Sequence, residues 1–211
     1  KAVYLSGNNE VRLIDLASLK SSSLVTDEIW GLNNATPSFS PDGEYVLYNA
    51  IRNFEADIFL IRLSDKKIFN ITNTGVAEQD PVWSPDGKYI YFVSDRSQPT
   101  YPYGMQDAKI YRMPLERIEK PFASDMYDSL FTQKKKDTTK KNIKTAVPNT
   151  SVVKINFADL MNRLEKIGPS FGNQRGVQVL QDGTKTRILF LSNHDGRMGL
   201  WQMVEEAFEE T

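Results

Sequence analysis

The one histidine of the chain, His194, is the side chain best suited to act as a general base near neutral pH. It lies in the polar run Ser192-Asn193-His194-Asp195-Gly196 between two apolar segments. A serine peptidase needs a hydroxyl nucleophile beside such a base and backbone donors for the oxyanion. Ser192 stands too near in sequence for a rigid scaffold to present it to His194, and no Gly-x-Ser-x-Gly elbow occurs. We therefore expect a loop histidine and no catalytic residue in this chain.

Carboxylates and metal ligands give no better candidate site. Asp80 and Asp86 could form the carboxylate pair of a glycosidase, but turn chemistry explains the second and nothing else supports that reaction. The sequence contains no histidine pair, no cysteine and no Asp-x-Asp-x-Asp-Gly loop. We expect neither a metal site nor a cofactor.

Composition indicates an ordinary globular protein. The 211 residues are 40% hydrophobic and 11% aromatic, and the net charge of −1 provides no field that would recruit nucleic acid. No apolar run approaches the ~20 residues of a membrane span, so no membrane span is expected. The lack of cysteine leaves the compartment open, with the periplasm favoured and the cytoplasm as the alternative.

The chain contains a repeated unit that must position the residues considered above. The sequence Pro-x-aromatic-Ser-Pro-Asp-Gly-x-Tyr occurs at Pro37–Tyr45 and again at Pro81–Tyr89, an offset of 44 residues. Ser-Pro-Asp-Gly suits a type I turn followed by a left-handed glycine, and the apolar runs after each turn predict strands buried on both faces. Tyr45, Leu47, Tyr89 and Tyr91 are expected between neighbouring sheets. Four-stranded blades of roughly 40–45 residues in a β-propeller fit this pattern.

We therefore predict an all-β partial propeller of three to four antiparallel blades that forms a single region over 1–211. The predicted blades cover residues 1–36 (partial), 37–80, 81–167 and 168–211 (partial), the last with a turn at Gln181-Asp182-Gly183. The first blade is expected to lack its inner strand, and the last blade is expected to lack its outer strand. The missing blades would come from a longer chain or from a second copy that pairs at the open ends.

The third blade contains an insertion over 116–150. Met126, Tyr127, Leu130 and Phe131 are spaced for one face of a short helix, and six lysines follow between Lys134 and Lys144. The lysine run has little aromatic interleaving, so a mobile solvated loop is a better interpretation than a nucleic-acid arm. After it, Val153, Ile155 and Phe157 alternate like a strand, whereas Leu160, Leu164 and Ile167 have helical spacing.

The two Ser-Pro-Asp-Gly units resemble the repeat shared by TolB, the tricorn protease and oligopeptidase-type propellers. Asp57-Ile58-Phe59 and Lys109-Ile110-Tyr111 match the later strand of that repeat. Val153–Leu160, followed by Arg163, resembles the segment Val-x-Ile-Asp-Phe-Glu-Gly-Ile of tricorn-like serine peptidases, although Asn156 replaces the Asp. In that family the segment is strand, turn and strand. The resemblance therefore implies strands at 152–157 and 162–167 in place of a helix.

Two functions follow from the resemblance. The first is the noncatalytic propeller part of a tricorn-like serine peptidase, which gates or binds peptides for a catalytic domain outside this chain. The second is a TolB-like propeller that binds a partner protein and belongs to no enzyme. Peptidase sequence downstream of Thr211 in the gene would support the first, and a stop codon there the second.

Overall fold

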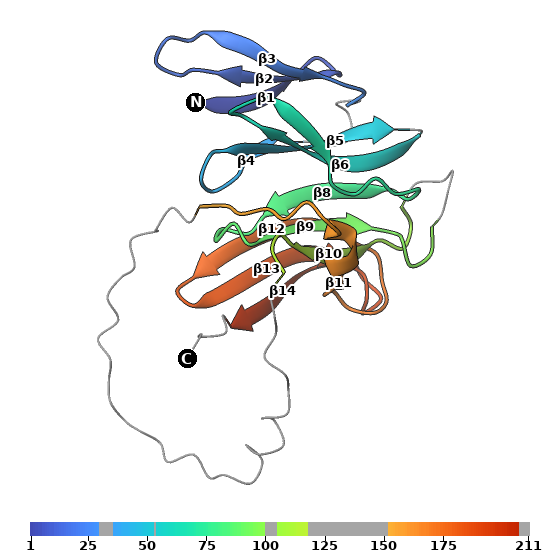
Figure 1. Cartoon of the computed structure of the whole chain (residues 1–211). Helices are drawn as coiled ribbons and strands as arrows, with labels where there is room; N and C mark the ends of the chain where they lie inside the picture. Colours follow the sequence, from blue (N-terminus) through green and yellow to red (C-terminus); the bar gives the residue numbers. More distant parts are fainter. Residues whose placement is uncertain (30–35, 53, 100–104, 118–151, 207–211) are drawn as a thin grey trace, which may run out of the picture.

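The computed structural model describes residues 1–29, 36–52, 54–99, 105–117 and 152–206. Strands form four antiparallel sheets that follow one another along the chain and lie face to face in a row (Figure 1). The first and last sheets lie at opposite ends of the row. Within the described ranges the single helical element is the 3-10 helix η1 (Leu160–Arg163). The predicted all-β fold with four-stranded blades is thus confirmed.

Each sheet is named here by its place in the chain. The N-terminal sheet contains β1 (Ala2–Ser6), β2 (Glu10–Ile14) and β3 (Ser21–Thr26). The second contains β4 (Ser38–Phe39), β5 (Tyr45–Arg52), β6 (Glu55–Arg62) and β7 (Lys67–Asn70). The third contains β8 (Glu78–Trp83), β9 (Tyr89–Ser94), β10 (Lys109–Pro114) and β11 (Glu165–Lys166). The C-terminal sheet contains β12 (Gln174–Asp182), β13 (Lys185–Ser192) and β14 (Gly199–Glu206).

The two repeated turns have the same hydrogen bonds, which explains why the sequence is written twice. In both, the serine Oγ donates to the aspartate Oδ1 at 2.6 Å and accepts from the backbone N–H of the next strand's tyrosine at 2.9 Å. The glycines have φ values of +76° and +70°, in the left-handed region that glycine adopts readily. The predicted Asp182-Gly183 turn differs. Asp182 pairs with Lys185 in the ladder, so Gly183-Thr184 forms the loop.

The start of the third sheet also differs from the sequence prediction. Strand β8 begins at Glu78 rather than at Pro81. Its register against β9 shifts between Gln79 and Val82, and Asp80 has a φ of +53°. A bulge is one of the few places where a strand tolerates proline, because no ladder hydrogen bond is required there. The predicted ranges of the blades stay a prediction.

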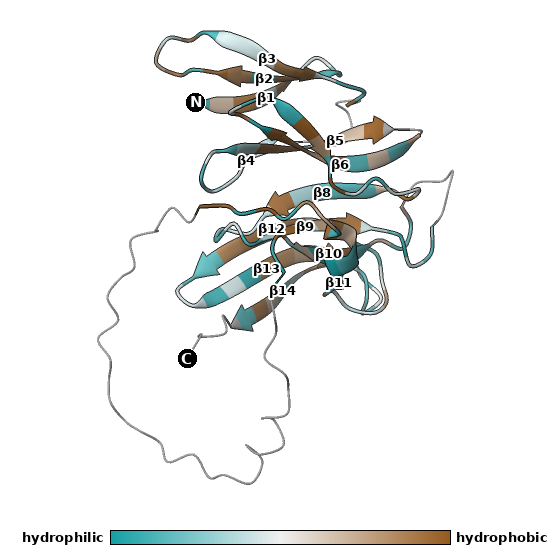
Figure 2. Cartoon of the chain, in the orientation of Figure 1, coloured by the Kyte–Doolittle hydropathy of each residue, from teal (hydrophilic) through white to brown (hydrophobic). Residues whose placement is uncertain are grey.

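The hydrophobic core consists of three layers, one between each pair of neighbouring sheets. Brown bands of apolar residues run along the central strands in Figure 2. Leu47 and Tyr91 are buried as predicted, with exposed fractions of 0% and 1%. Tyr45 and Tyr89 are only half-buried, because each begins its strand at the rim beside a turn.

A strap, defined as residues 152–164, crosses from the third sheet back to the second. The Val153 N–H donates to Asp42 Oδ2 at 2.7 Å, and Phe157 stacks on Phe69 of β7 with ring centroids 4.0 Å apart. Of the two strands predicted from the resemblance, the first is wrong and the second is confirmed only over β11. Residues 152–157 form no strand, and of 162–167 only β11 pairs with β10. Of the three residues at helical spacing, only Leu160 lies in η1, whereas Leu164 and Ile167 follow it.

The predicted helix around Met126–Phe131 and the lysine run Lys134–Lys144 lie outside the described residues. Most of the predicted insertion does so as well.

We expect Gly87→Ala to destabilise the protein more than Gly43→Ala. Both substitutions place a side chain at positive φ, which costs roughly 1–2 kcal/mol. A Cβ at Gly87 would lie 2.6 Å from Val153 Cγ2 of the strap, whereas nothing lies within 4 Å at Gly43. Overpacking of this kind adds about 1–3 kcal/mol. Urea unfolding of the two variants measures the difference, and equal losses would mean that the strap does not pack on this turn.

Candidate functional site

The structure brings Ser192 and His194 together, contrary to the sequence expectation. The Ser192 Oγ lies 2.9 Å from Nδ1 of His194 and accepts from the His194 backbone N–H at 3.2 Å. The serine is fully buried, and the Trp201 ring lies 4.2 Å from the imidazole between ring centroids. A nucleophile must reach the substrate carbonyl, which a hydroxyl with 0% exposure does not. The contact therefore stabilises a turn.

The structure also separates the two aspartates considered as a carboxylate pair. Asp80 Oδ2 accepts from the Gly176 N–H of the C-terminal sheet at 3.3 Å. Asp86 is bound within its own turn by Ser84. Within the described ranges, no group of three or more His, Cys, Asp or Glu side chains could hold a metal ion.

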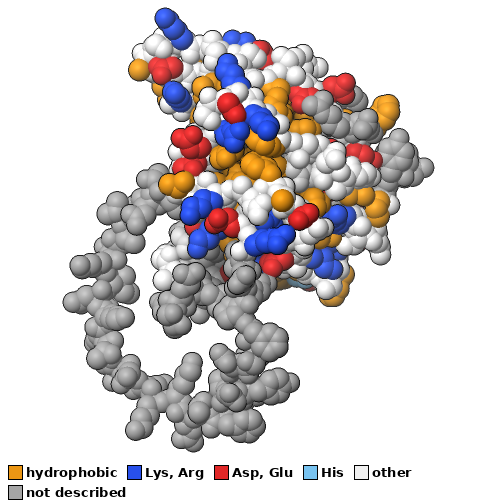
Figure 3. Space-filling view, viewed as in Figure 1, with side chains coloured by type: hydrophobic (Ala, Val, Ile, Leu, Met, Phe, Trp, Pro, Cys, Tyr) orange, Lys and Arg blue, Asp and Glu red, His pale blue; other side chains and the backbone are white. Residues whose placement is uncertain are grey.

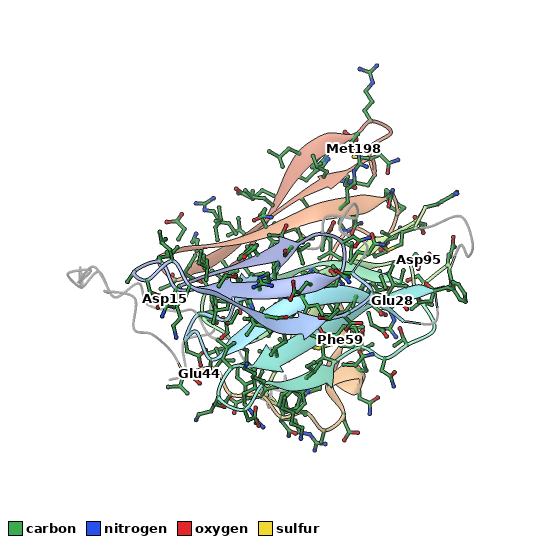
Figure 4. All side chains as sticks on the ribbon, turned by 90° about the horizontal axis from the view of Figure 1, so that it is seen from above. Asp15, Glu28, Glu44, Phe59, Asp95 and Met198 are labelled. Carbon is green, nitrogen blue, oxygen red and sulfur yellow. The ribbon has the colours of Figure 1, made fainter. Side chains whose placement is uncertain are left out.

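A different set of carboxylates gathers at the junction of the second and third sheets. We call Glu55, Asp57, Glu78 and Asp95 the carboxylate cluster. It lies at the strand ends opposite the Ser-Pro-Asp-Gly turns, where β6 and β8 begin and β9 ends. Figure 4 shows Asp95 at one end of the strands and Glu44, beside a Ser-Pro-Asp-Gly turn, at the other. Asp57, Glu78 and Asp95 are buried, and Glu55 is half-buried.

Asp57 is the structural member of the cluster. Its Oδ2 accepts from Asn70 Nδ2 at 2.8 Å, and its Oδ1 accepts from Thr72 Oγ1 at 3.0 Å. The Thr72 hydroxyl oxygen accepts in turn from the Ile58 N–H at 3.0 Å. The Thr74 N–H also donates to Oδ1, at 3.4 Å. Three neutral donors thus solvate the buried carboxylate and join the start of β6 to the end of β7 and the connection after it.

Glu78 is less completely satisfied. Its Oε1 accepts from Thr74 Oγ1 at 2.7 Å, but its Oε2 is buried without a hydrogen-bond partner. Burial raises the pKa of Glu78 to about 7, and the Asp57 charge adds to the rise, whereas the Thr74 hydroxyl and the Arg96 charge oppose it. The carboxyl therefore titrates near neutral pH.

Arg96 has a buried donor without a hydrogen-bond partner. It follows β9, its Nη1 is buried without a hydrogen-bond partner, and its guanidinium lies over the Tyr111 ring at 5.7 Å from Cζ to the centroid. The pKa of Glu55 is raised by burial and by the charges of Asp95 and Asp57. The junction thus contains more acidic than basic side chains. It also contains one buried acceptor, Glu78 Oε2, and one buried donor, Arg96 Nη1, without hydrogen-bond partners.

This part of the site was missed in the sequence. Glu78 falls just before the second repeat and Arg96 just after its second strand, with no motif around either. Only Asp57 belonged to a recognised pattern, as the first residue of Asp57-Ile58-Phe59. Sequence spacing could not show that the three come to one junction, because Asp57 belongs to the second sheet and Glu78 and Arg96 to the third.

The two end sheets expose different outer faces. The C-terminal sheet packs Val177, Ile188 and Phe190 on the third sheet, so alternate residues point away from it. We call this outer surface the C-terminal face. Its exposed apolar side chains are Leu180 (50% exposed), Leu191 (36%), Leu200 (72%) and Val204 (44%).

The outer face of the N-terminal sheet is hydrogen-bonded instead. Arg12 Nε donates to Ser21 Oγ at 3.0 Å, Tyr4 OH lies 2.8 Å from the same oxygen, and Arg12 pairs with Glu10 at 3.0 Å. Elsewhere, the surface seen in Figure 3 mixes basic and acidic side chains around hydrophobic ones, as a net charge of −1 suggests. No helix in the described part of the chain is long and apolar enough to span a membrane.

Sheets stacked in a row, each with antiparallel strands in sequential order, define the class of the protein as a β-propeller. A family model described as the TolB beta propeller domain matches residues 2–198, so the chain belongs to this family. No curated protein matches it in sequence.

One solved structure shows the same fold over most of the chain. The chain is similar to the tricorn protease, with 14% identity and a TM-score of 0.54, over 92% of this chain and 20% of that one. It also matches TolB from Acinetobacter baumannii, with 17% identity and a TM-score of 0.41, over 97% of this chain and 51% of that one. A putative TolB from Agrobacterium tumefaciens has 22% identity and a TM-score of 0.40, over 50% and 37%. The chain thus spans about half of these proteins or less, and the likeness concerns fold alone.

Proposed function

We propose that this chain is the noncatalytic propeller part of a tricorn-like serine peptidase, where it binds or gates peptides for a catalytic domain. The observation that carries the noncatalytic part is the burial of Ser192, the hydroxyl beside the one histidine. The strap adds support, because the segment that resembles the tricorn-like peptidases is an ordered part of the core, with Leu160 only 5% exposed.

A second candidate is a TolB-like propeller that binds a partner protein and belongs to no enzyme. The C-terminal face favours it, because exposed apolar residues gathered on one sheet face are typical of a protein interface. The two candidates differ in ligand. The first predicts binding of short unstructured peptides, and the second predicts binding of a folded partner only.

We expect the purified chain to bind peptides without cleaving them. Fluorescence anisotropy with a labelled casein digest measures binding, and quenched fluorogenic peptides measure cleavage in the same samples. His194→Ala should change neither result, because the imidazole hydrogen-bonds within its own turn and packs on Trp201. Cleavage that His194→Ala abolishes would overturn the noncatalytic assignment. Absence of any peptide binding would favour the partner-binding alternative.

A further inference from the structure

Thr74 lies between two acceptors but has only one hydroxyl proton. Its Oγ1 is 2.7 Å from Glu78 Oε1 and 3.2 Å from the backbone oxygen of Val76. If Glu78 is ionised, it can only accept, so the proton serves either the carboxylate or the Val76 carbonyl. If Glu78 is protonated, its own O–H donates to Thr74 Oγ1, and the Thr74 hydroxyl donates to Val76. The protonated form therefore satisfies both contacts, whereas the ionised form satisfies one.

The burial of Glu78 also favours the protonated form. The residue has 0% exposure, and its Oε2 has no hydrogen-bond partner. Such an oxygen costs more free energy when the carboxyl is charged. The Thr74 N–H donates to Asp57 Oδ1 at 3.4 Å, so one residue contacts both Glu78 and a second buried carboxylate. Neighbouring carboxylates resist simultaneous ionisation.

The charged groups around Glu78 come from both sheets. Burial raises its pKa most, the charge of Asp57 on β6 adds to the rise, and the charge of Arg96 after β9 opposes it. Loss of the Glu78 proton therefore adds a charge to a junction that already contains more acidic than basic side chains. The other polar residues of these strand ends are Glu55 of β6, Asp95 after β9, the uncharged ladder partner Ser94 on β9, and Asp80 of β8, which contacts β12.

Hydrogen bonds fix both ends of the β7–β8 connection, residues 71–77. At its start the Ile71 N–H donates to a β6 carbonyl at 2.9 Å, and at its end Asn49 Nδ2 donates to the Glu78 backbone oxygen at 2.9 Å. Between them, Thr74 is half-buried and Gly75 is exposed. A change in the charge of Glu78 therefore acts on residues 74–77, which lie next to solvent.

We propose that Glu78 is the proton-sensitive element of a conformational switch in the middle of the β7–β8 connection. In the protonated form, hydrogen bonds from Glu78 through Thr74 to Val76 hold residues 74–77 against the strand ends. When the proton is released to solvent, Thr74 donates to the carboxylate, Val76 loses its donor, and Glu78 Oε2 requires water. The connection then moves outward, and water reaches the carboxylate. The switch does not depend on what the chain binds.

A nitroxide spin label at position 75 tests the switch. The chain has no cysteine, and nothing lies within 4 Å of a Cβ at Gly75, so Gly75→Cys provides a single labelling site without displacing a neighbour. With a pKa of about 7, the ionised fraction of Glu78 rises about tenfold from pH 6 to pH 8. The mobile fraction in the electron paramagnetic resonance spectrum should rise by the same factor. A label at Ser64→Cys, in the exposed turn between β6 and β7, is the control and should not change.

Variants of the labelled chain identify the groups responsible. Glu78→Gln should abolish the pH dependence, because the amide can donate to Thr74 Oγ1 at every pH. Thr74→Val should make the label mobile at both pH values, whereas Thr74→Ser, which retains the hydroxyl, should preserve the transition.

Three results would overturn the switch. The first is a label at position 75 whose mobility does not change between pH 6 and pH 8, or still changes in Glu78→Gln. The second is an equal change at position 64, which would show that the whole protein loosens. The third is a Thr74→Val label that stays immobile at pH 6, which would show that the hydroxyl does not hold the connection.

Discussion

Glu78→Gln should raise the stability of the protein at pH 8 and leave it nearly unchanged at pH 4.5. The unfolded chain releases the Glu78 proton near its ordinary pKa of 4.5, whereas the folded protein retains it until about pH 7. The contribution of this proton to the free energy of unfolding is therefore fully present below pH 4.5. It is lost as the pH rises from 4.5 through 7. At about 1.4 kcal/mol per pKa unit, the loss is on the order of 3 kcal/mol.

Glutamine has no charge to desolvate and can still accept from Thr74 Oγ1. For a chain of this size, thermal unfolding at pH 8 should shift upward by about 6–12 °C. Glu44→Gln is the matched control, since Glu44 is exposed beside the first Ser-Pro-Asp-Gly turn. A pH-independent difference between Glu78→Gln and the unmodified chain would show that Glu78 does not retain its proton at neutral pH.

The isolated chain should self-associate through the C-terminal face. Leu191 and Leu200 are opposite each other in the ladder of β13 and β14, with exposed fractions of 36% and 72%. In the covered sheets the equivalent apolar rows are removed from water by the next sheet, at roughly 25 cal/mol per Å². The combined variant Leu191→Lys and Leu200→Glu should make the chain monomeric and abolish binding of an apolar dye.

The two charges in that variant form a cross-strand pair, so the sheet itself should be preserved. Leu19→Lys is the control, because Leu19 is 72% exposed in the connection between β2 and β3, away from the C-terminal face. Light scattering across a concentration series measures the outcome. If the unmodified chain is monomeric at all concentrations and binds no dye, the C-terminal face does not mediate self-association.

Much of the fold could be predicted because local residues determine it. Ser40-Pro41-Asp42-Gly43 closes its own hydrogen bonds within six residues of chain, so a second copy at Ser84 predicts a second identical turn. The continuous apolar runs of β5 and β9 also identify strands covered on both faces without any knowledge of the partner sheet. The turn at Asp182 was placed one residue early, because it lacks the serine that closes the others.

The sequence alone determined the class of structure and the repeated turn, since both depend on residues that are contiguous in the chain. Only the tertiary structure decided the rest. It placed Ser192 against His194 but buried it, and it folded the strap onto Asp42 instead of into a ladder. It also brought Glu78, at the start of β8, and Arg96, just after β9, to the same edge of the third sheet. Pairing across sheets depends on how twisted layers stack, and burial then sets the charge state of the groups between them.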